Sequence, residues 1–170
     1  LPYTGAGVLA SAVGMDKAVS KTLAIHARLP ILSYTILRAP KDLPQARRLR
    51  LPVFVKPARL GSSVGVYKVK KAADLSGAVR KAFRFDSTVI VEEGIEAREI
   101  EVAVLGSGLA AKLDLRASVV GEIRPNAEFY SYEAKYLDPD GAKLLVPAEL
   151  TRAQADTARR MALEAFIANG

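Results

Sequence analysis

The chain has 170 residues, of which 50% are hydrophobic and 25% charged, as in a globular protein with a real core rather than a disordered chain. It has no cysteine, which excludes disulfides, thiolate metal sites and cysteine nucleophiles, and it has no apolar run long enough for a transmembrane helix. The net charge of +7 allows nucleic acid, a membrane surface or phosphorylated small molecules as partners, but the basic residues are spread along the chain, which favours solvated loops.

Hydrophobic spacing predicts the elements of the first half of the chain. Met15, Val19, Leu23 and His26 recur at helical spacing, whereas β-branched runs bounded by Gly or Pro favour strands. A polar stretch with two prolines favours a loop. The expected elements are, in order, a helix over 15–27, a strand over 29–37, a loop over 40–50, a strand over 53–55, a glycine-containing loop over 61–65 and a returning strand over 64–69.

The second half of the chain continues with mixed elements. Thr151 and Gln154 form a capping-box pattern that predicts the start of a long helix. The expected elements are, in order, a helix over 74–85, strands over 88–91, 100–105 and 118–123, a polar, tyrosine-rich loop over 126–141 and a helix from 151 to about 168. This order predicts an α/β (α+β) fold with an antiparallel component.

A lysine and a glycine-rich loop are the first candidate site. Lys56 ends an apolar strand and is followed by Gly61-Ser62-Ser63-Val64-Gly65. Glycines allow close backbone approach to a ligand, serines add donors, and the lysine supplies a positive charge for phosphate. A plain hairpin turn is the alternative interpretation of the same residues.

Carboxylates at a strand end are the second candidate. Glu92 and Glu93 follow an apolar strand, where they could hydrogen-bond an adenine amino group or a ribose hydroxyl, or could simply be solvated. Glu99 and Glu101 alternate about Ile100, so we expect them to share one face of a strand, either toward solvent or toward a site.

Two further features carry weaker signals. The segment Phe129–Tyr136 combines three tyrosines with an acid and a lysine outside any periodic element, which indicates either a loop packed onto a ligand or an ordinary surface loop. His26 is the only histidine. Its place near the end of a predicted helix favours a structural histidine over a general base.

Taken together and in this order, the segments resemble the D-alanine–D-alanine ligases of the ATP-grasp type. The resemblance covers essentially the whole chain. The matching segments are Pro2-Tyr3-Thr4-Gly5 through Met15-Asp16-Lys17, Val55 to Gly65, Glu92 with Arg98 to Val102, Val119 to Ile123, Phe129 to Tyr136, and Val146 to Leu150.

The resemblance implies a role for each segment, in an ATP-binding site. Lys17 and Lys56 would hold the phosphates of ATP, and the loop with Gly61, Ser62, Ser63 and Gly65 would close over them, Ser62 also serving the substrate side. The adenine and ribose would meet Glu92, Glu93, Ile95 and Glu99. Lys135 would reach the γ-phosphate, and Tyr136 would bond the serine loop so that the two loops exclude water.

The implied reaction is the ATP- and Mg²⁺-dependent joining of two D-alanines through an acyl phosphate, for peptidoglycan precursors in the cytoplasm. Tyr136 favours D-alanine over D-lactate as the second substrate. Glu93 departs from the pattern, because the family usually has lysine there. Another ATP-grasp carboxylate–amine ligase is the alternative, and a basic nucleic-acid-binding module is a more distant one, since the aromatic residues lie in one loop.

The resemblance also implies a domain division. We expect a connector and helix over 1–28, a central nucleotide-binding ATP-grasp subdomain over 29–105, and the start of a C-terminal subdomain over 106–170 with a mobile loop over 126–141. The family's N-terminal domain and its metal-binding C-terminal segment are expected to lie outside these 170 residues, which alone should not catalyse ligation. The partners expected are small molecules and, at full length, a second copy, but no membrane or nucleic acid; we also expect no signal peptide.

Overall fold

The computed structural model describes residues 4–106, 114–126 and 141–170. The chain divides into two compact units. The first, here called the four-stranded unit, comprises Ala12–Thr22 and Pro30–Glu96; the second, the C-terminal unit, comprises Leu1–Ser11, Leu23–Leu29 and Ala97–Gly170. Among the described residues, no helix is both long enough and apolar enough to cross a membrane.

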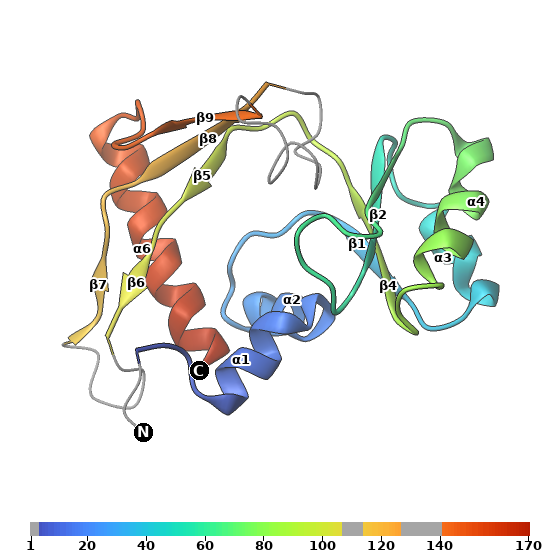
Figure 1. The fold of residues 1–170 in the computed structure, drawn as a ribbon, viewed down its shortest axis with the longest axis horizontal. Helices are drawn as coiled ribbons and strands as arrows, with labels where there is room; N and C mark the ends of the chain where they lie inside the picture. Colours follow the sequence, from blue (N-terminus) through green and yellow to red (C-terminus); the bar gives the residue numbers. More distant parts are fainter. Residues whose placement is uncertain (1–3, 107–113, 127–140) are drawn as a thin grey trace. The chain divides into compact units, whose positions relative to one another are not determined.

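The four-stranded unit is built on an antiparallel sheet with the strand order β1-β4-β2-β3 (Figure 1). Its strands are β1 Tyr34–Leu37, β2 Val53–Pro57, β3 Tyr67–Val69 and β4 Val89–Glu93. The hairpin expected from the glycine-containing loop is confirmed, because β2 and β3 pair with Val53 opposite Val69 and Val55 opposite Tyr67. β3 is shorter than expected.

One face of this sheet carries the main core. Alternate residues of the strands point to it, and helix α4 (Ala72–Ala82) covers it with Leu75 and Val79. Side chains at every second position of a strand share a face, so one register buries the whole set. The strand residues in this cluster are Leu37, Val53, Val55, Val69, Val89 and Val91.

The opposite face is covered through helix α2 (Lys17–His26). Ala18 of this helix packs with Ala58 and Ile90, and Tyr34 and Ile36 lie against them. The central strand β4 is therefore buried on both faces, which accounts for its unbroken apolar run at residues 89–91.

The helix expected over residues 15–27 is confirmed as α2, but a second helix before it was not expected. Helix α1 spans Val8–Met15 and α2 begins at Lys17. The carboxylate of Asp16 accepts hydrogen bonds from the backbone N–H groups of Ala18 (2.9 Å) and Val19 (3.2 Å). Asp16 thus satisfies the unpaired donors at the start of α2, and a new helix begins there.

The loop expected over residues 40–50 is wrong in part, because the structure has a 3-10 helix, η1 (Pro40–Asp42), followed by the short α3 (Leu43–Ala46). Proline is accepted in the first turn of a helix, where its missing N–H is not needed. The Asp42 carboxylate also accepts hydrogen bonds from the backbone of Arg38 and Ala39, both at 2.9 Å. The prolines therefore start these turns.

The C-terminal unit has a three-stranded sheet of order β5-β8-β9, a two-stranded sheet of β6 and β7, and the long helix α6 (Figure 1). The elements are β5 Glu99–Glu101, β6 Val104–Leu105, β7 Arg116–Ala117, β8 Gly121–Pro125, β9 Ala142–Leu145 and α6 Arg152–Asn169. Strand β9 was not expected from the sequence. The tyrosine-rich loop lies mostly outside the described residues.

The strand expected over residues 100–105 is divided into β5 and β6, and of the strand expected over 118–123 only residues 121–123 lie in a strand, β8. Where residues 100–105 and 118–123 meet, Ser118 donates its N–H to the carbonyl of Ala103 (2.9 Å), and its hydroxyl accepts the N–H of Ala103 (3.0 Å). A side-chain oxygen takes the place of a backbone carbonyl at this point, which interrupts the ladder.

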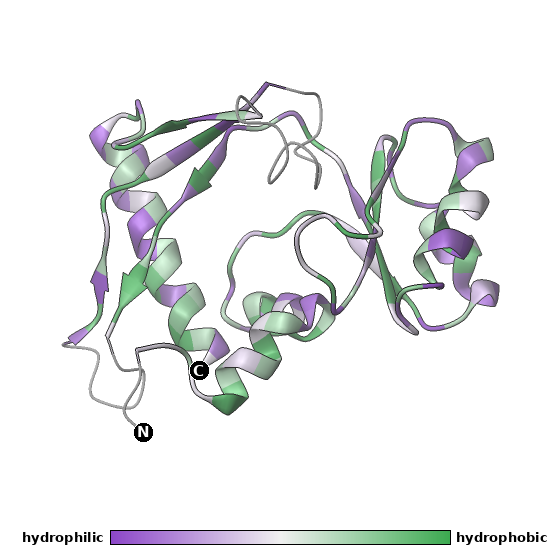
Figure 2. Cartoon of the chain, in the orientation of Figure 1, coloured by the Kyte–Doolittle hydropathy of each residue, from purple (hydrophilic) through white to green (hydrophobic). Residues whose placement is uncertain are grey.

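Helix α6 begins at the predicted capping box. The N–H of Gln154 donates to the Thr151 hydroxyl (3.3 Å), and the N–H of Thr151 donates to the Gln154 side chain (3.0 Å). Hydrophilic and hydrophobic residues alternate around the helix (Figure 2). The predicted α/β fold with antiparallel strands is confirmed for both units.

Candidate functional site

A cavity of about 270 Å³ lies on the α2 face of the four-stranded unit. Three of its side chains are lysines and one is a carboxylate, so the lining carries a net charge of +2. It is lined by Gly14, Lys17, Ser20, Lys21, Lys56, Ile90 and Glu92. Such a lining suits an anionic ligand.

The sheet register brings the β residues of the cavity together. In the pairing of β2 with β4, Lys56 lies opposite Ile90 and Phe54 opposite Glu92. Lys56 is two residues from Phe54 on β2, and Glu92 is two residues from Ile90 on β4. All four side chains therefore lie on the same face of the sheet. Helix α2 adds Lys17 and Lys21, which are four residues apart and so lie one turn apart on the same side of the helix.

Glu92 is the most buried charged group of the cavity, with 7% of its surface exposed. Its Oε2 lies 2.6 Å from Nζ of Lys21, and its Oε1 is paired with Nζ of Lys56. Burial alone raises the pKa of this carboxyl, but Lys56 and Lys21 together outweigh burial and hold the pKa below its ordinary value. Glu92 is therefore ionised at neutral pH.

Lys17 links helix α2 to the backbone that leads into the glycine-rich loop. Its Nζ donates to the carbonyls of Leu60 and of Ala58, the latter at 3.4 Å, and its own N–H donates to Ala58 at 3.0 Å. Burial lowers the pKa of Lys17, and the nearby positive charge of Lys56 lowers it further. An anion between the two ammonium groups relieves that repulsion.

The glycine-rich loop adopts left-handed backbone at three positions. The φ angles are 54° at Ser62, 60° at Ser63 and 69° at Gly65. At Gly65 a Cβ atom would lie 2.9 Å from the side chains of both Phe85 and Pro57, so the position requires glycine. Left-handed residues occur in the backbone turns that bind anions through N–H groups, which is what a phosphate-binding loop needs.

Glu93 lies next to Glu92 but on the other side of the strand. Its carboxylate accepts the backbone N–H of Arg50 (2.7 Å), and its own N–H donates to the carbonyl of Ser33 (2.9 Å). The side chain therefore holds the segment before β2, and it does not line the cavity. Ile95, beyond the end of β4, is 62% exposed.

The structure thus brings together Lys17, Lys56 and Glu92 of the residues expected from the sequence. Glu99 belongs to the C-terminal unit, where it and Glu101 are exposed on the same face of β5, as their spacing predicted. Lys135 and Tyr136 lie outside the described residues. His26 is the last residue of α2, as its predicted place near a helix end required, and its side chain is exposed.

Lys21 is the site residue that the sequence interpretation missed. It pairs with Glu92, and its Nζ also lies 4.9 Å from the centroid of the Tyr34 ring. The available signal was its spacing, because a lysine one turn after Lys17 lies on the same side of the helix. Only the tertiary structure shows that a strand residue meets it there.

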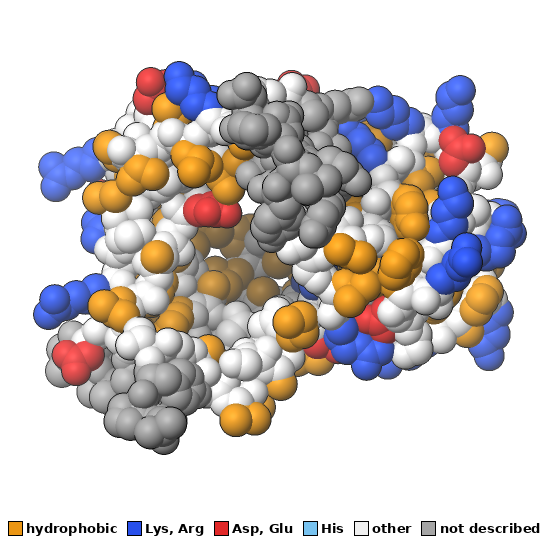
Figure 3. Space-filling model, viewed as in Figure 1, with side chains coloured by type: hydrophobic (Ala, Val, Ile, Leu, Met, Phe, Trp, Pro, Cys, Tyr) orange, Lys and Arg blue, Asp and Glu red, His pale blue; other side chains and the backbone are white. Residues whose placement is uncertain are grey.

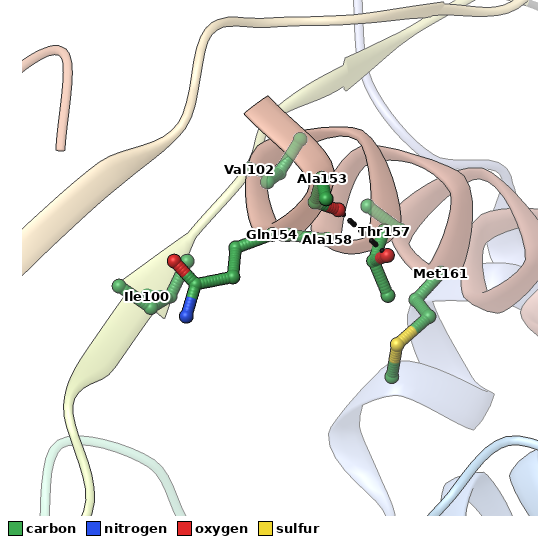
Figure 4. Close-up of a pocket in the computed structure, with 8 residues that line it drawn as sticks. Ile100, Val102, Ala153, Gln154, Thr157, Ala158 and Met161 are labelled. Atoms are coloured by element: carbon green, nitrogen blue, oxygen red, sulfur yellow. Dashed lines mark hydrogen bonds between the residues drawn. The ribbon is translucent and has the colours of Figure 1, made fainter. Parts of the chain in front are cut away.

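A second, larger cavity of about 560 Å³ lies in the C-terminal unit and is mainly apolar (Figure 4). It is lined by Ile100 of β5, by Val102 just after that strand, and by residues of α6 that include Met161. Its polar side chains are already used within the helix: Gln154 accepts from Thr151, and the hydroxyl of Thr157 donates to the carbonyl of Ala153 (2.8 Å). This lining offers no charge to an anionic ligand.

The grouping of acidic and histidine side chains decides whether the described residues could bind a metal ion. Within residues 4–106, 114–126 and 141–170, no three His, Asp or Glu side chains come together as a group that could hold a metal ion. The described residues therefore supply cations for an anion, and they do not supply a metal centre.

Known proteins are similar to this chain in sequence and in architecture. Residues 23–169 match the family model described as D-ala D-ala ligase C-terminus. The chain is 49% identical to D-alanine--D-alanine ligase A of Bradyrhizobium diazoefficiens, covering 98% of the chain and 46% of that protein. It is 47% identical to the D-alanine--D-alanine ligase of Bacillus cytotoxicus, covering 99% and 47%.

A solved structure agrees with the sequence matches. The VanG D-Ala:D-Ser ligase from Enterococcus faecalis superposes with a TM-score of 0.84 at 30% identity, over 100% of this chain and 49% of that one. The chain therefore spans about half the length of the proteins that it matches.

Proposed function

Because the chain belongs to the D-alanine–D-alanine ligase family, we propose that its protein joins two D-alanines into D-alanyl-D-alanine at the expense of ATP, for peptidoglycan precursors. The observation that carries the proposal is the cavity with a net charge of +2, whose Lys17 also donates to the carbonyl of Leu60, just before the glycine-rich loop. Its cations come from two elements and surround one small volume, as the phosphates of a nucleotide require.

The described residues fit a nucleotide. Lys17 and Lys56 would take the phosphates, since both ammonium groups line the cavity. The loop with Gly61, Ser62, Ser63 and Gly65 would close over them. Glu92 would face the adenine, with the backbone of Glu93 and the side chain of Ile95. Glu99 would take the ribose hydroxyls, and Lys135, Tyr136 and Ser62 would complete the reaction site.

Bound ATP would supply the phosphoryl group that activates the carboxylate of the first D-alanine toward the amine of the second. The protein's own contribution is positional and electrostatic. Lys17 and Lys56 would neutralise the phosphate charge, and the serine loop would orient the reacting groups. Closing the loops would keep water from the activated carboxylate.

Three further proposals follow from the family. We propose that Mg²⁺ accompanies the nucleotide, although the described residues offer no ligand set for it and no step is derived through it. We propose that the protein works in the cytoplasm and forms a homodimer. We also propose that residues 29–105 correspond to the central ATP-grasp subdomain, with residues 106–170 as the start of the next one.

The proposal is tested with the natural, full-length protein. We expect ADP release that requires D-alanine, with D-alanyl-D-alanine as the product. Lys56→Met removes one phosphate cation, and the expected result is a rise of the KM for ATP by at least about tenfold. Turnover that does not respond to D-alanine would contradict the proposal.

D-Serine is a second candidate for the second substrate, because a D-Ala:D-Ser ligase superposes on the whole chain. A competition assay with equal D-alanine and D-serine decides between them, with the dipeptides separated by mass. We expect D-alanyl-D-alanine to predominate, in line with the sequence matches.

A further inference from the structure

Two lysines from different elements share the carboxylate of Glu92. Lys21 of α2 holds Oε2 at 2.6 Å, and Lys56 of β2 holds Oε1. Each carboxylate oxygen thus has a cation of its own. Lys56 has a place in the proposed function as a phosphate ligand, whereas Lys21 has none so far.

Lys21 is held from two sides. Its ammonium lies 4.9 Å from the centroid of the Tyr34 ring, and Tyr34 is the cross-strand partner of Glu92 in the pairing of β1 with β4. The side chain of Lys21 is 20% exposed. A cation between an aromatic face and a carboxylate is attracted to both. Lys21 is therefore a fixed charge of the cavity.

Lys56 has similar neighbours, with its Nζ 5.3 Å from the centroid of the Phe54 ring, but the proposed function makes it a phosphate ligand. An ammonium group has three N–H donors, and Glu92 takes one of them. A phosphate that enters the cavity competes with Glu92 for Lys56. The attraction of Glu92 for Lys56 is weaker when a second cation already neutralises part of the carboxylate's charge.

From this geometry we propose that Lys21 is a positioning residue for the nucleotide: it neutralises Glu92 from the α2 side and so leaves Lys56 available to the phosphates. The inference rests on the proposed function, since it takes Lys56 to bind phosphate. Lys21 acts through Glu92 and Lys56 and does not itself touch the ligand. Its effect should therefore depend on the phosphates and on the charge of Glu92.

The first experiment measures binding and kinetics of Lys21→Met in the natural, full-length protein. We expect the Kd for a non-hydrolysable ATP analogue and the KM for ATP to rise about tenfold, as for the loss of one charged hydrogen bond. Binding of adenosine, kcat at saturating ATP and the KM for D-alanine should change less than about twofold. A purely structural role would move these values together.

Two variants serve as controls. Lys21→Arg keeps the charge and should restore most of the affinity for the ATP analogue. Lys41→Met removes an exposed lysine from the same unit and should leave the affinity unchanged. If Lys21→Met does not fold, as judged by its thermal unfolding, Lys21→Gln is measured in its place by the same criteria.

A double-mutant cycle with Glu92→Gln tests the route of the effect. In the Glu92→Gln background, Lys21→Met should change the affinity for the ATP analogue less than about twofold. The same tenfold loss in both backgrounds would mean that Lys21 contacts the nucleotide directly, and it would overturn the proposal. So would an unchanged affinity of the single Lys21→Met variant. Absence of nucleotide binding by the unmodified protein would instead overturn the proposed function.

Discussion

Glu92 and Glu122 are both buried carboxylates, but Glu122 is paired with two arginines and Glu92 with two lysines. Two guanidinium nitrogens of Arg98 donate to the Glu122 carboxylate, at 2.7 and 2.6 Å, and Arg124 donates a third hydrogen bond at 3.0 Å. Glu92 meets two lysines instead. The planar guanidinium makes a rigid two-point contact, whereas an ammonium is a point charge that can turn to another partner. Glu122 therefore suits a structural role and Glu92 a site that exchanges partners.

The ion pairs of Glu122 make the stability of the protein depend on pH. The hydrogen bonds from Arg98 and Arg124 lower the pKa of Glu122 from 4.5 to about 2 in the folded state. A lowered folded pKa stabilises the fold above the unfolded pKa, and this contribution is lost as pH falls from about 4.5 to about 2. We expect Glu122→Gln to reduce the free energy of unfolding at pH 7 and to differ little from the unmodified protein near pH 2.

Denaturant unfolding at several pH values between these limits checks this prediction. Glu164→Gln is the control, because that carboxylate lies on the exposed side of α6 in an i,i+4 pair with Arg160 and such pairs contribute little. A constant difference between Glu122→Gln and the unmodified protein at all pH values would contradict the assigned cause.

Two glycines of the same loop should respond differently to substitution. Gly65→Ala requires a left-handed alanine whose Cβ meets Phe85 and Pro57 at 2.9 Å. We expect it to lower the free energy of unfolding by at least about 1 kcal/mol. At Gly61 a Cβ would meet no atom within 4 Å, so Gly61→Ala should change stability by less than about 0.5 kcal/mol. Urea unfolding of both variants, each compared with the unmodified protein, decides the matter.

At the level of elements, local signals placed the starts of helices well where a side chain caps them. Thr151 and Gln154 predicted the start of α6, and both hydrogen bonds of the box are present. Asp16 is the same kind of signal for α2, which begins two residues later than the spacing predicted. Pro40 and Pro44 predicted a loop, yet both lie in the first turn of a helix, where the missing N–H of proline costs no hydrogen bond.

The cap of α6 can be tested against a matched threonine within the helix. Thr151→Ala removes the acceptor for the N–H of Gln154 and should lower the free energy of unfolding by about 1 kcal/mol. Thr157→Ala removes a hydroxyl that bonds the carbonyl four residues earlier, and alanine is the better helix former. We expect Thr157→Ala to be neutral or slightly stabilising. Equal losses for the two variants would argue against the cap.

At the scale of the whole molecule, charge is divided unevenly between the two units. The four-stranded unit has 15 lysines and arginines against 7 acids, a balance of +8, whereas the C-terminal unit has 10 against 11. Figure 3 shows Lys and Arg side chains gathered over the region of α3 and α4. The exposed residues there include Arg47, Arg48, Arg80 and Lys81. The net charge of the chain thus arises in the unit that carries the lysine cavity.

This field predicts that nucleotide binding depends on salt. Raising the ionic strength from about 0.05 M to about 0.5 M shortens the screening length to a few ångströms and weakens the attraction between exposed lysines and phosphates. We expect the Kd of the ATP analogue to rise severalfold, while that of adenosine stays constant. Calorimetric titration at the two salt concentrations measures both, and equal shifts for the two ligands would rule out the electrostatic explanation.

The sequence by itself determined the fold class, the β2–β3 hairpin, the main helices and two of the cavity's lysines, Lys17 and Lys56. These depend on short-range spacing: apolar periodicity, a capping pair, and a lysine before a glycine-rich turn. The tertiary structure decided which charges meet. Glu92 and Glu93 are neighbours in sequence, but side chains alternate along a strand. Glu92 therefore lines the cavity, whereas the Glu93 carboxylate accepts the backbone N–H of Arg50. Lys21 reaches Glu92 only because α2 packs on that face of the sheet, a contact between residues 71 positions apart that local spacing does not encode.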